Sequence, residues 1–221
     1  TSLYSQDIPI GVWRDHLPYT NCIDLVEVNE VIYVATPYSL FSYNKVDNSL
    51  KRMSKVNGLS DVGIRFLRYN EAFKILIVVY NNSNIDLIKE DGVHNIPEIM
   101  LKNVTGSKAI NNITFNGDFA YLSCAYGITV LNLKKLEIKE TYIIAATNTQ
   151  VNVNDITFMN DSIYAASNSG LYKASLNAQN LQSFEYWQLD TLLFQNGTII
   201  NYIKTFENCL VVSKRDRKSV V

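Results

Sequence analysis

Few residues of this sequence have the types and spacing that catalysis needs. Its two histidines are His16, which follows Arg14 and Asp15, and His94. An imidazole beside a carboxylate can form a general acid–base pair, but neighbouring residues of a strand point to opposite faces. We therefore interpret His16 as part of an exposed polar strand and His94 as an exposed residue of an edge strand. The sequence predicts no catalytic residues, and hence a protein that is not an enzyme.

Motifs that would hold a cofactor or a metal are also missing from the sequence. It contains no P-loop, G-x-S-x-G, H-E-x-x-H or EF-hand pattern. Cys22, Cys124 and Cys209 have no metal-ligand spacing, and we expect free thiols packed as small hydrophobic side chains. An active site at a channel mouth would need converging carboxylates, which the sequence does not indicate. We predict no cofactor and no metal.

Composition excludes several classes of protein. Hydrophobic residues make up 47% of the 221 residues and charged residues 19%, which is unlike a disordered segment. The net charge of −1 gives no electrostatic attraction for nucleic acid, so we predict no nucleic-acid partner. We expect the basic cluster at 214–218 to be a solvated tail. No apolar stretch of about 18 residues occurs, so we predict no transmembrane segment.

A repeated pattern of short apolar runs organises the chain. Runs rich in β-branched and aromatic residues begin at Val31, Ile75, Ala120, Ser162 and Cys209, which are 44, 45, 42 and 47 residues apart. Each follows another such run and a tight turn of Asn, Asp, Gly or Glu, the pattern of a β-hairpin. Most continue into a third and a fourth run. Four strands in about 44 residues are typical of one blade of a β-propeller.

We therefore predict an all-β fold, a β-propeller of four-stranded blades with about five repeats present. We assign the repeats to residues 21–61, 62–109, 110–150, 151–198 and, in part, 199–214. The segment 1–20, with Trp13, could supply a closing strand, and 215–221 is the charged tail. The fifth repeat has only two strands, so we expect an incomplete ring, completed by further sequence or by a partner chain. A fourth, more variable run closes each unit, at 50–53, 138–144 and 184–189, and the weakest member is 93–101, which Pro97 breaks.

One face of such a propeller carries the turns between second and third strands and the linkers between blades. The side chains there are mostly Tyr and Asn, which suit contacts with sugars or with a protein surface. The alternative is that they are simply the residues that turns require. The candidate ligand-binding residues are Tyr38, Asn82, Tyr126 and Asn168 in the turns, and Asn57, Asp61 and Asn148 in the linkers.

Two stretches of sequence resemble a known repeat. Residues 57–62 with Ile64, and residues 163–172, resemble the linker and strands of two-component-regulator propeller repeats, although Tyr33-Val34-Ala35-Thr36 replaces the usual Trp-Ile-Gly-Thr. Residues 13–19, 55–61 and 84–88 are similar to the N-terminal propeller of PorZ-type proteins of Bacteroidetes, which are associated with the type IX secretion system.

The resemblance implies a non-enzymatic, exported scaffold in the periplasm or at the cell surface. It implies two propellers and a C-terminal sandwich-like domain, of which this chain would be the first part, an anionic lipopolysaccharide ligand and a sortase-like partner. The polar residues 1–5 could remain after cleavage of an export signal or be an addition to the natural chain. The alternative function is a glycan-sensing extracytoplasmic propeller of a hybrid two-component regulator.

Overall fold

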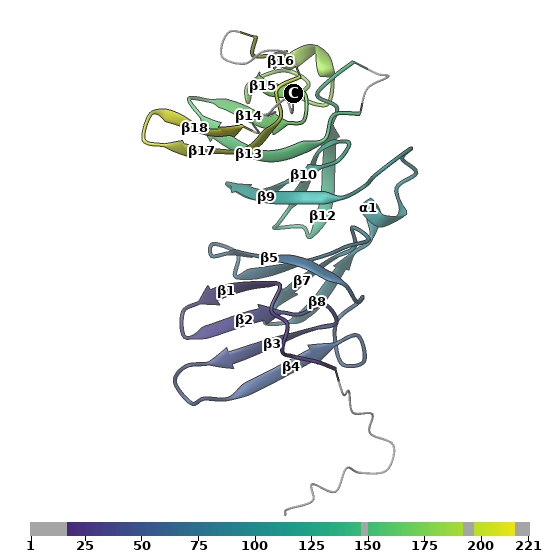
Figure 1. The fold of residues 1–221 in the computed structure, drawn as a ribbon, viewed down its shortest axis with the longest axis vertical. Coiled ribbons are helices and arrows are strands. Elements are labelled where there is room, and N and C mark those ends of the chain that lie inside the picture. Colours follow the sequence, from purple (N-terminus) through teal and green to yellow (C-terminus); the bar gives the residue numbers. More distant parts are fainter. Residues whose placement is uncertain (1–16, 147–149, 192–196, 215–221) are drawn as a thin grey trace, which may run out of the picture.

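The computed structural model describes residues 17–146, 150–191 and 197–214, and these residues form five antiparallel sheets (Figure 1). The sheet at one end of the row contains β1 and the sheet at the other end contains β17 and β18, so the described sheets do not close into a ring. The predicted fold class, an all-β propeller with an incomplete ring, is confirmed. The predictions for Trp13, His16, Asn148 and the tail 215–221 concern residues outside those that the structure describes.

Each sheet is a meander in which strands adjacent in sequence pair with each other. The first sheet contains β1 (Asp24–Val28), β2 (Val31–Ala35), β3 (Ser39–Asn44) and β4 (Leu50–Ser54). The second contains β5 (Ile64–Asn70), β6 (Ile75–Tyr80), β7 (Ile85–Lys89) and β8 (Gly92–Ile96). The third contains β9 (Ile110–Asn116), β10 (Phe119–Cys124), β11 (Gly127–Asn132) and β12 (Glu137–Tyr142). The fourth contains β13 (Val153–Met159), β14 (Ser162–Ser167), β15 (Gly170–Ser175) and β16 (Gln188–Leu189), and the fifth β17 (Ile200–Phe206) and β18 (Cys209–Lys214).

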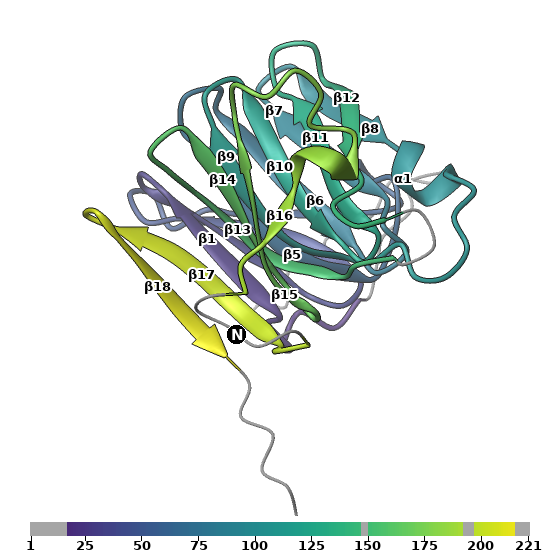
Figure 2. The same ribbon diagram turned by 90° about the horizontal axis from the view of Figure 1, so that it is seen from above.

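The core is divided among the spaces between successive sheets. Every residue of β6 and β14 is buried, because both faces of these strands pack against neighbouring sheets. Apolar clusters fill the contacts between the first and second, second and third, third and fourth, and fourth and fifth sheets. Seen from above, the sheets overlap, and β17 and β18 lie on the side away from α1 (Figure 2). This layered packing explains the burial of the second strands in the inner sheets.

Two of the fourth strands differ from the sequence-based expectation. The strand expected over 93–101 ends at Ile96, and Pro97 is the N-cap of the short helix α1 (Glu98–Leu101). Proline can precede a helix because its missing N–H is not needed there. The strand expected over 184–189 begins with a 3₁₀ helix, Phe184–Tyr186, and only Gln188–Leu189 pair with β15.

The cysteines are free, as expected, but their burial is uneven. Cys124 is buried, whereas Cys22 and Cys209 are exposed, so the expectation that all three pack as hydrophobic side chains is wrong for two of them. Both exposed thiols lie at or near the start of strands in the end sheets, where one side has no neighbouring sheet among the described residues. None of the described helices is long and apolar enough to span a membrane.

Candidate functional site

The turns between second and third strands and the linkers between sheets lie at one end of the sheets, which we call the turn face. At sheets one and two this face is continuous. The backbone N–H of Gly63 donates to the carbonyl of Pro37, and the N–H of Asn81 donates to the carbonyl of Gly63, both at 2.8 Å. The linker 55–63 thus connects the turn 36–38 to the turn 81–84.

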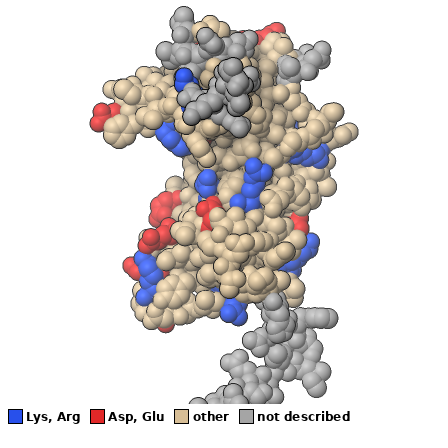
Figure 3. Space-filling view, in the orientation of Figure 1, with Lys and Arg blue, Asp and Glu red and all other residues tan. Residues whose placement is uncertain are grey.

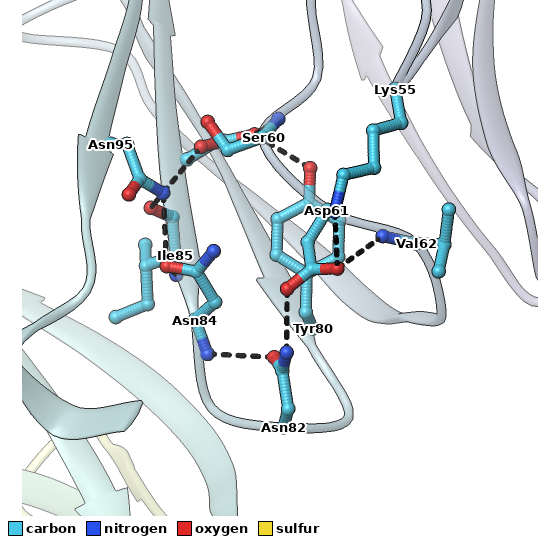
Figure 4. A network of polar contacts seen from close by, with 10 residues as sticks. Lys55, Ser60, Asp61, Val62, Tyr80, Asn82, Asn84, Ile85 and Asn95 are labelled. Carbon is cyan, nitrogen blue, oxygen red and sulfur yellow. Dashed lines mark hydrogen bonds and ion pairs between the residues drawn. The ribbon is translucent and has the colours of Figure 1, made fainter. Parts of the chain in front are cut away.

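Two predicted residues, Asp61 and Asn82, meet on the turn face (Figure 4). The side-chain amide of Asn82 donates to Asp61 Oδ2 at 2.5 Å, and the backbone N–H of Val62 donates to Asp61 Oδ1 at 2.9 Å. Lys55 Nζ lies 3.5 Å from the same carboxylate. Burial acts to raise the pKa of Asp61, but these hydrogen bonds and the Lys55 charge outweigh it and lower the pKa below its usual value.

The buried carboxylate of Asp86 fixes this part of the turn face. This carboxylate, which is fully buried, accepts hydrogen bonds from the Ser60 backbone N–H at 2.8 Å, the Tyr80 hydroxyl at 2.6 Å and the Asn95 amide at 2.9 Å. Burial and the bond to Asp86 both raise the pKa of Tyr80, so the phenol remains a donor. Asp86 was not predicted as a site residue, although an acidic residue between Ile85 and Leu87 in an apolar strand is a visible signal.

The other predicted residues lie apart. Tyr38 is 49% exposed. Asn57 is exposed, but its side-chain oxygen accepts from the backbone N–H and hydroxyl of Ser54. Asn168 is exposed in the turn of the fourth sheet, where its oxygen accepts from the Asn154 amide at 2.9 Å. The structure therefore distributes these residues along the turn face.

Tyr126 requires a correction. The sequence analysis places it on the turn face as a contact residue, but it is only 5% exposed. Its hydroxyl is 2.9 Å from the hydroxyl of Thr129, and the ammonium of Lys102 lies 5.0 Å from the centre of its ring. Both Tyr126 and the next residue of this turn, Gly127, are buried, so Tyr126 supports the turn and is not available for a ligand.

Exposed apolar side chains accompany the polar residues of the turn face. Val56 is 63% exposed and Val62 is 47% exposed, and both belong to the linker that carries Asp61. Together with Tyr38, they place apolar surface beside a fixed carboxylate. On the face seen in Figure 3, charged side chains of both signs are scattered over a mostly uncharged surface.

The first strands of successive sheets carry a second set of polar contacts that the sequence analysis did not find. Four of these strands have a one-residue register shift at the same repeat position, as in a β-bulge. The side chain of Asn111 at this position donates to the carbonyl of Val153 on the next sheet, and Asn154 donates likewise to Ile200, both at 2.7 Å. The recurrence of Ile-Asn-Asn-Ile at 110–113 and Val-Asn-Asp-Ile at 153–156 is the sequence pattern from which these contacts could have been predicted.

Groups that could support catalysis are few in the described part of the chain. His94 Nε2 lies 3.3 Å from Asp91 Oδ1 beside the turn that joins β7 and β8, where the His94 side chain is 41% exposed and that of Asp91 60%. Among residues 17–146, 150–191 and 197–214, no cluster of three His, Cys, Asp or Glu side chains could hold a metal ion.

Known structures share this fold. PorZ of Porphyromonas gingivalis, an essential bacterial surface component of the type IX secretion system, is 24% identical with a TM-score of 0.75 over 87% of this chain. The extracellular domain of a putative one-component system from B. thetaiotaomicron is 12% identical with a TM-score of 0.64 over 91% of the chain. The extracellular domain of a putative hybrid two-component system from B. thetaiotaomicron is 12% identical with a TM-score of 0.63 over 90% of the chain. The chain spans 25%, 27% and 27% of these three structures, respectively.

The family comparison is more specific than the likeness of fold. No curated protein is a significant match to the sequence. The family described as the N-terminal β-propeller domain of PorZ, of the type IX secretion system, matches residues 32–188. That range covers most of the chain, from β2 to the start of β16. The chain belongs to the family of PorZ N-terminal β-propeller domains.

Proposed function

We propose that this propeller domain is a non-enzymatic scaffold of an exported secretion component, and that its turn face binds a protein partner. The observation that carries the proposal is the exposed apolar surface of Tyr38, Val56 and Val62 beside the fixed Asp61–Asn82 pair. Family membership supports a role connected with type IX secretion.

The chemistry of this surface is that of a protein interface. Tyrosine is enriched in protein interfaces and supplies a large contact area with little loss of conformational entropy. The carboxylate of Asp61 already has its partners in place, so a partner would meet a pre-organised polar group. Asp86 holds the linker through Ser60, which limits the ordering that binding would require.

The expected partner is the sortase-like enzyme that the PorZ resemblance implies, and the expected location is the periplasm or the cell surface. PorZ itself is described as a bacterial surface component, which supports an exported location. Lipopolysaccharide is the second expected ligand of the whole protein. Since the chain spans about a quarter of PorZ, lipopolysaccharide binding requires the full-length protein for its test.

The test compares two exposed valines at opposite ends of the first two sheets. Val62 lies on the turn face, and Val46, which is 72% exposed, lies in the turn between β3 and β4 at the other end. In full-length protein, Val62→Asp should weaken binding to the sortase-like enzyme at least tenfold, or about 1.4 kcal/mol, as measured by surface plasmon resonance. Val46→Asp should leave it unchanged. Equal effects of the two variants would refute the assignment of the turn face.

A second candidate is a sensor propeller of a hybrid two-component regulator. It is favoured by the fold similarity to the extracellular domain of such a putative system, at a TM-score of 0.63. The two candidates differ in the sequence beyond this chain. A transmembrane helix followed by a kinase domain in the full-length gene would support the sensor, whereas a sandwich-like domain would support the secretion component.

A further inference from the structure

A cleft of about 680 Å³ lies between the third and fourth sheets, at the end opposite to the turn face. Its walls are the turn between β9 and β10, the strand β12 and the segment 176–182 that follows β15. The cleft exists because the fourth strand of the fourth sheet is short. β16 has two residues, whereas β4, β8 and β12 have five or six, and the chain before β16 does not pair with β15.

Aromatic side chains form the floor of this cleft. Tyr121 and Tyr142 line it from β10 and β12, and both are almost fully buried. The ring of Tyr121 packs edge-on against Phe158 with centroids 4.9 Å apart, and Tyr142 lies 6.1 Å from Trp187. These contacts fix the two phenol rings, so the floor is rigid.

A carboxylate at the wall is held in one orientation by three donors. Glu140 accepts hydrogen bonds from the Tyr142 hydroxyl and the Gln182 amide at 3.0 Å, and Lys139 Nζ lies 2.9 Å away. Burial acts to raise the pKa of Glu140, but these three partners outweigh it, and the pKa is lowered. The backbone N–H of Ile143 donates to the carbonyl of Gln182 at 3.2 Å, which ties the segment 176–182 to β12. The polar wall is therefore pre-organised.

The charges of the cleft are balanced. Glu140 is paired with Lys139, and Asp118 is paired with Lys134 at 3.2 Å. The cleft therefore offers no surplus cation for a phosphate, sulfate or carboxylate. The ammonium of Lys139 lies 4.6 Å from the centre of the Phe119 ring, so one face of the most accessible aromatic ring is covered by a charge. That arrangement does not suit the deep apolar anchor of a peptide side chain.

We propose that this cleft binds a neutral saccharide, as a second site separate from the protein-binding turn face. The volume lies within the range of small-molecule sites. Most of its lining side chains can hydrogen-bond, among them the amides of Asn116, Asn180 and Gln182. The Gln182 amide and the Glu140 carboxylate, which are held against each other, can bind adjacent hydroxyl groups as donor and acceptor, and the two buried tyrosines keep the floor of the cleft in place.

The test uses isothermal titration of the chain with neutral gluco- and manno-oligosaccharides and with their phosphorylated and sulfated counterparts. Ala178→Trp fills the cleft from the loop side without removing a polar group, and it should abolish binding. Gln182→Ala removes one amide and should weaken binding about tenfold. Tyr38→Ala, on the turn face, should leave saccharide binding unchanged, so the failure of this proposal is distinguishable from the failure of the turn-face proposal.

Three results would overturn the assignment of the cleft. The first is that no neutral saccharide binds, and the second is that the charged counterparts bind more tightly. The third is that saccharide binding is retained in the Ala178→Trp variant. Circular dichroism of the Ala178→Trp variant checks that its fold is retained. If the variant is unfolded, the saccharide-induced shifts of the Asn180 amide signals in the nuclear magnetic resonance spectrum provide the decision. These shifts should need about tenfold more saccharide in Gln182→Ala than in the unchanged chain, and an equal need in both would overturn the assignment.

Discussion

Asp155 on β13 is joined to Ile203 on β17 by a hydrogen bond of 3.1 Å, from the backbone N–H of Ile203 to the carboxylate. The ammonium of Lys204, the next residue, is also 3.1 Å from this carboxylate, and the Asn112 amide donates to it at 2.6 Å from the preceding sheet. Asp155 is fully buried. One carboxylate therefore connects the first strands of three successive sheets.

The same connection recurs at the other end of the row. Asp24 on β1 accepts a hydrogen bond from the backbone N–H of Leu67 on β5 at 2.9 Å, and Arg68 lies 3.4 Å from its carboxylate. The guanidinium of Arg68 then donates to Asn112 on the third sheet at 2.7 Å. Acidic residues at one repeat position thus bind the N–H and the cation of the next sheet, which aligns successive sheets.

Removing the buried carboxylate should destabilise the domain more than removing the partly exposed one. We expect Asp155→Ala to lower the free energy of unfolding by about 3 kcal/mol, because it leaves a buried N–H and a buried amide without acceptors. Asp24→Ala should cost about 1 kcal/mol, since the Asp24 side chain is 29% exposed and water can take part of its place. Urea denaturation followed by circular dichroism measures both. Similar losses for the two variants would show that burial does not control this connection.

Local sequence was sufficient to predict the repeat but not the contacts between repeats. Apolar runs and tight turns depend on neighbouring residues, so the hairpins and the five units were predictable. The contacts of Asp155 with Ile203 and Lys204 join residues 48 and 49 positions apart. No local pattern specifies such a pair, although the repeated Asn-Asn and Asn-Asp steps marked its position.

The sequence was sufficient to predict which positions of the candidate site lie on the turn face, but not how their side chains contact one another. Asp61 and Asn82 were expected on the same face, but their direct contact depends on how the linker 55–63 folds over the second sheet. Tyr126 was misplaced because a turn position does not determine which way a side chain points. The short β16 was missed because Phe184–Leu189 has the composition of a strand, while its start forms a 3₁₀ helix. The cleft beside it could not be foreseen.

A matched pair of glycines tests the close approach of β11 to β12. Gly127 has φ of +133°, and a Cβ there would overlap the backbone carbonyl oxygen of Tyr142. Gly92 has a similar φ of +139°, but a Cβ there would contact nothing within 4 Å. We expect Gly92→Ala to cost about 1 kcal/mol from backbone strain alone. Gly127→Ala should cost about 3 kcal/mol, since β12 must shift. Thermal unfolding of both variants measures these costs. Equal costs would show that the overlap at Gly127 is relieved without loss of stability.

The Asp61 carboxylate should make the stability of the turn face depend on pH. Its pKa in the folded chain is below the usual value, so its contribution is complete above the unfolded value of about 3.9 and is lost as the pH falls through the folded value. The difference in unfolding free energy between wild type and Asp61→Asn should be constant near neutral pH and shrink below about pH 4. Asn82→Ala should reduce this pH dependence. A difference that does not change with pH would show that the carboxylate charge is not stabilising.

The three cysteines should separate by reactivity in the folded chain. Burial raises the pKa of the Cys124 thiol to about 11, so only about one thousandth of it is thiolate at pH 8, and its side chain is also inaccessible. Cys22 and Cys209 are exposed. We expect iodoacetamide at pH 8 to alkylate these two and to modify Cys124 only after urea is added, as measured by mass spectrometry of the peptides. Alkylation of Cys124 in the folded chain as fast as Cys209 would mean that the contact between the second and third sheets opens readily, because Cys124 belongs to the apolar cluster between them.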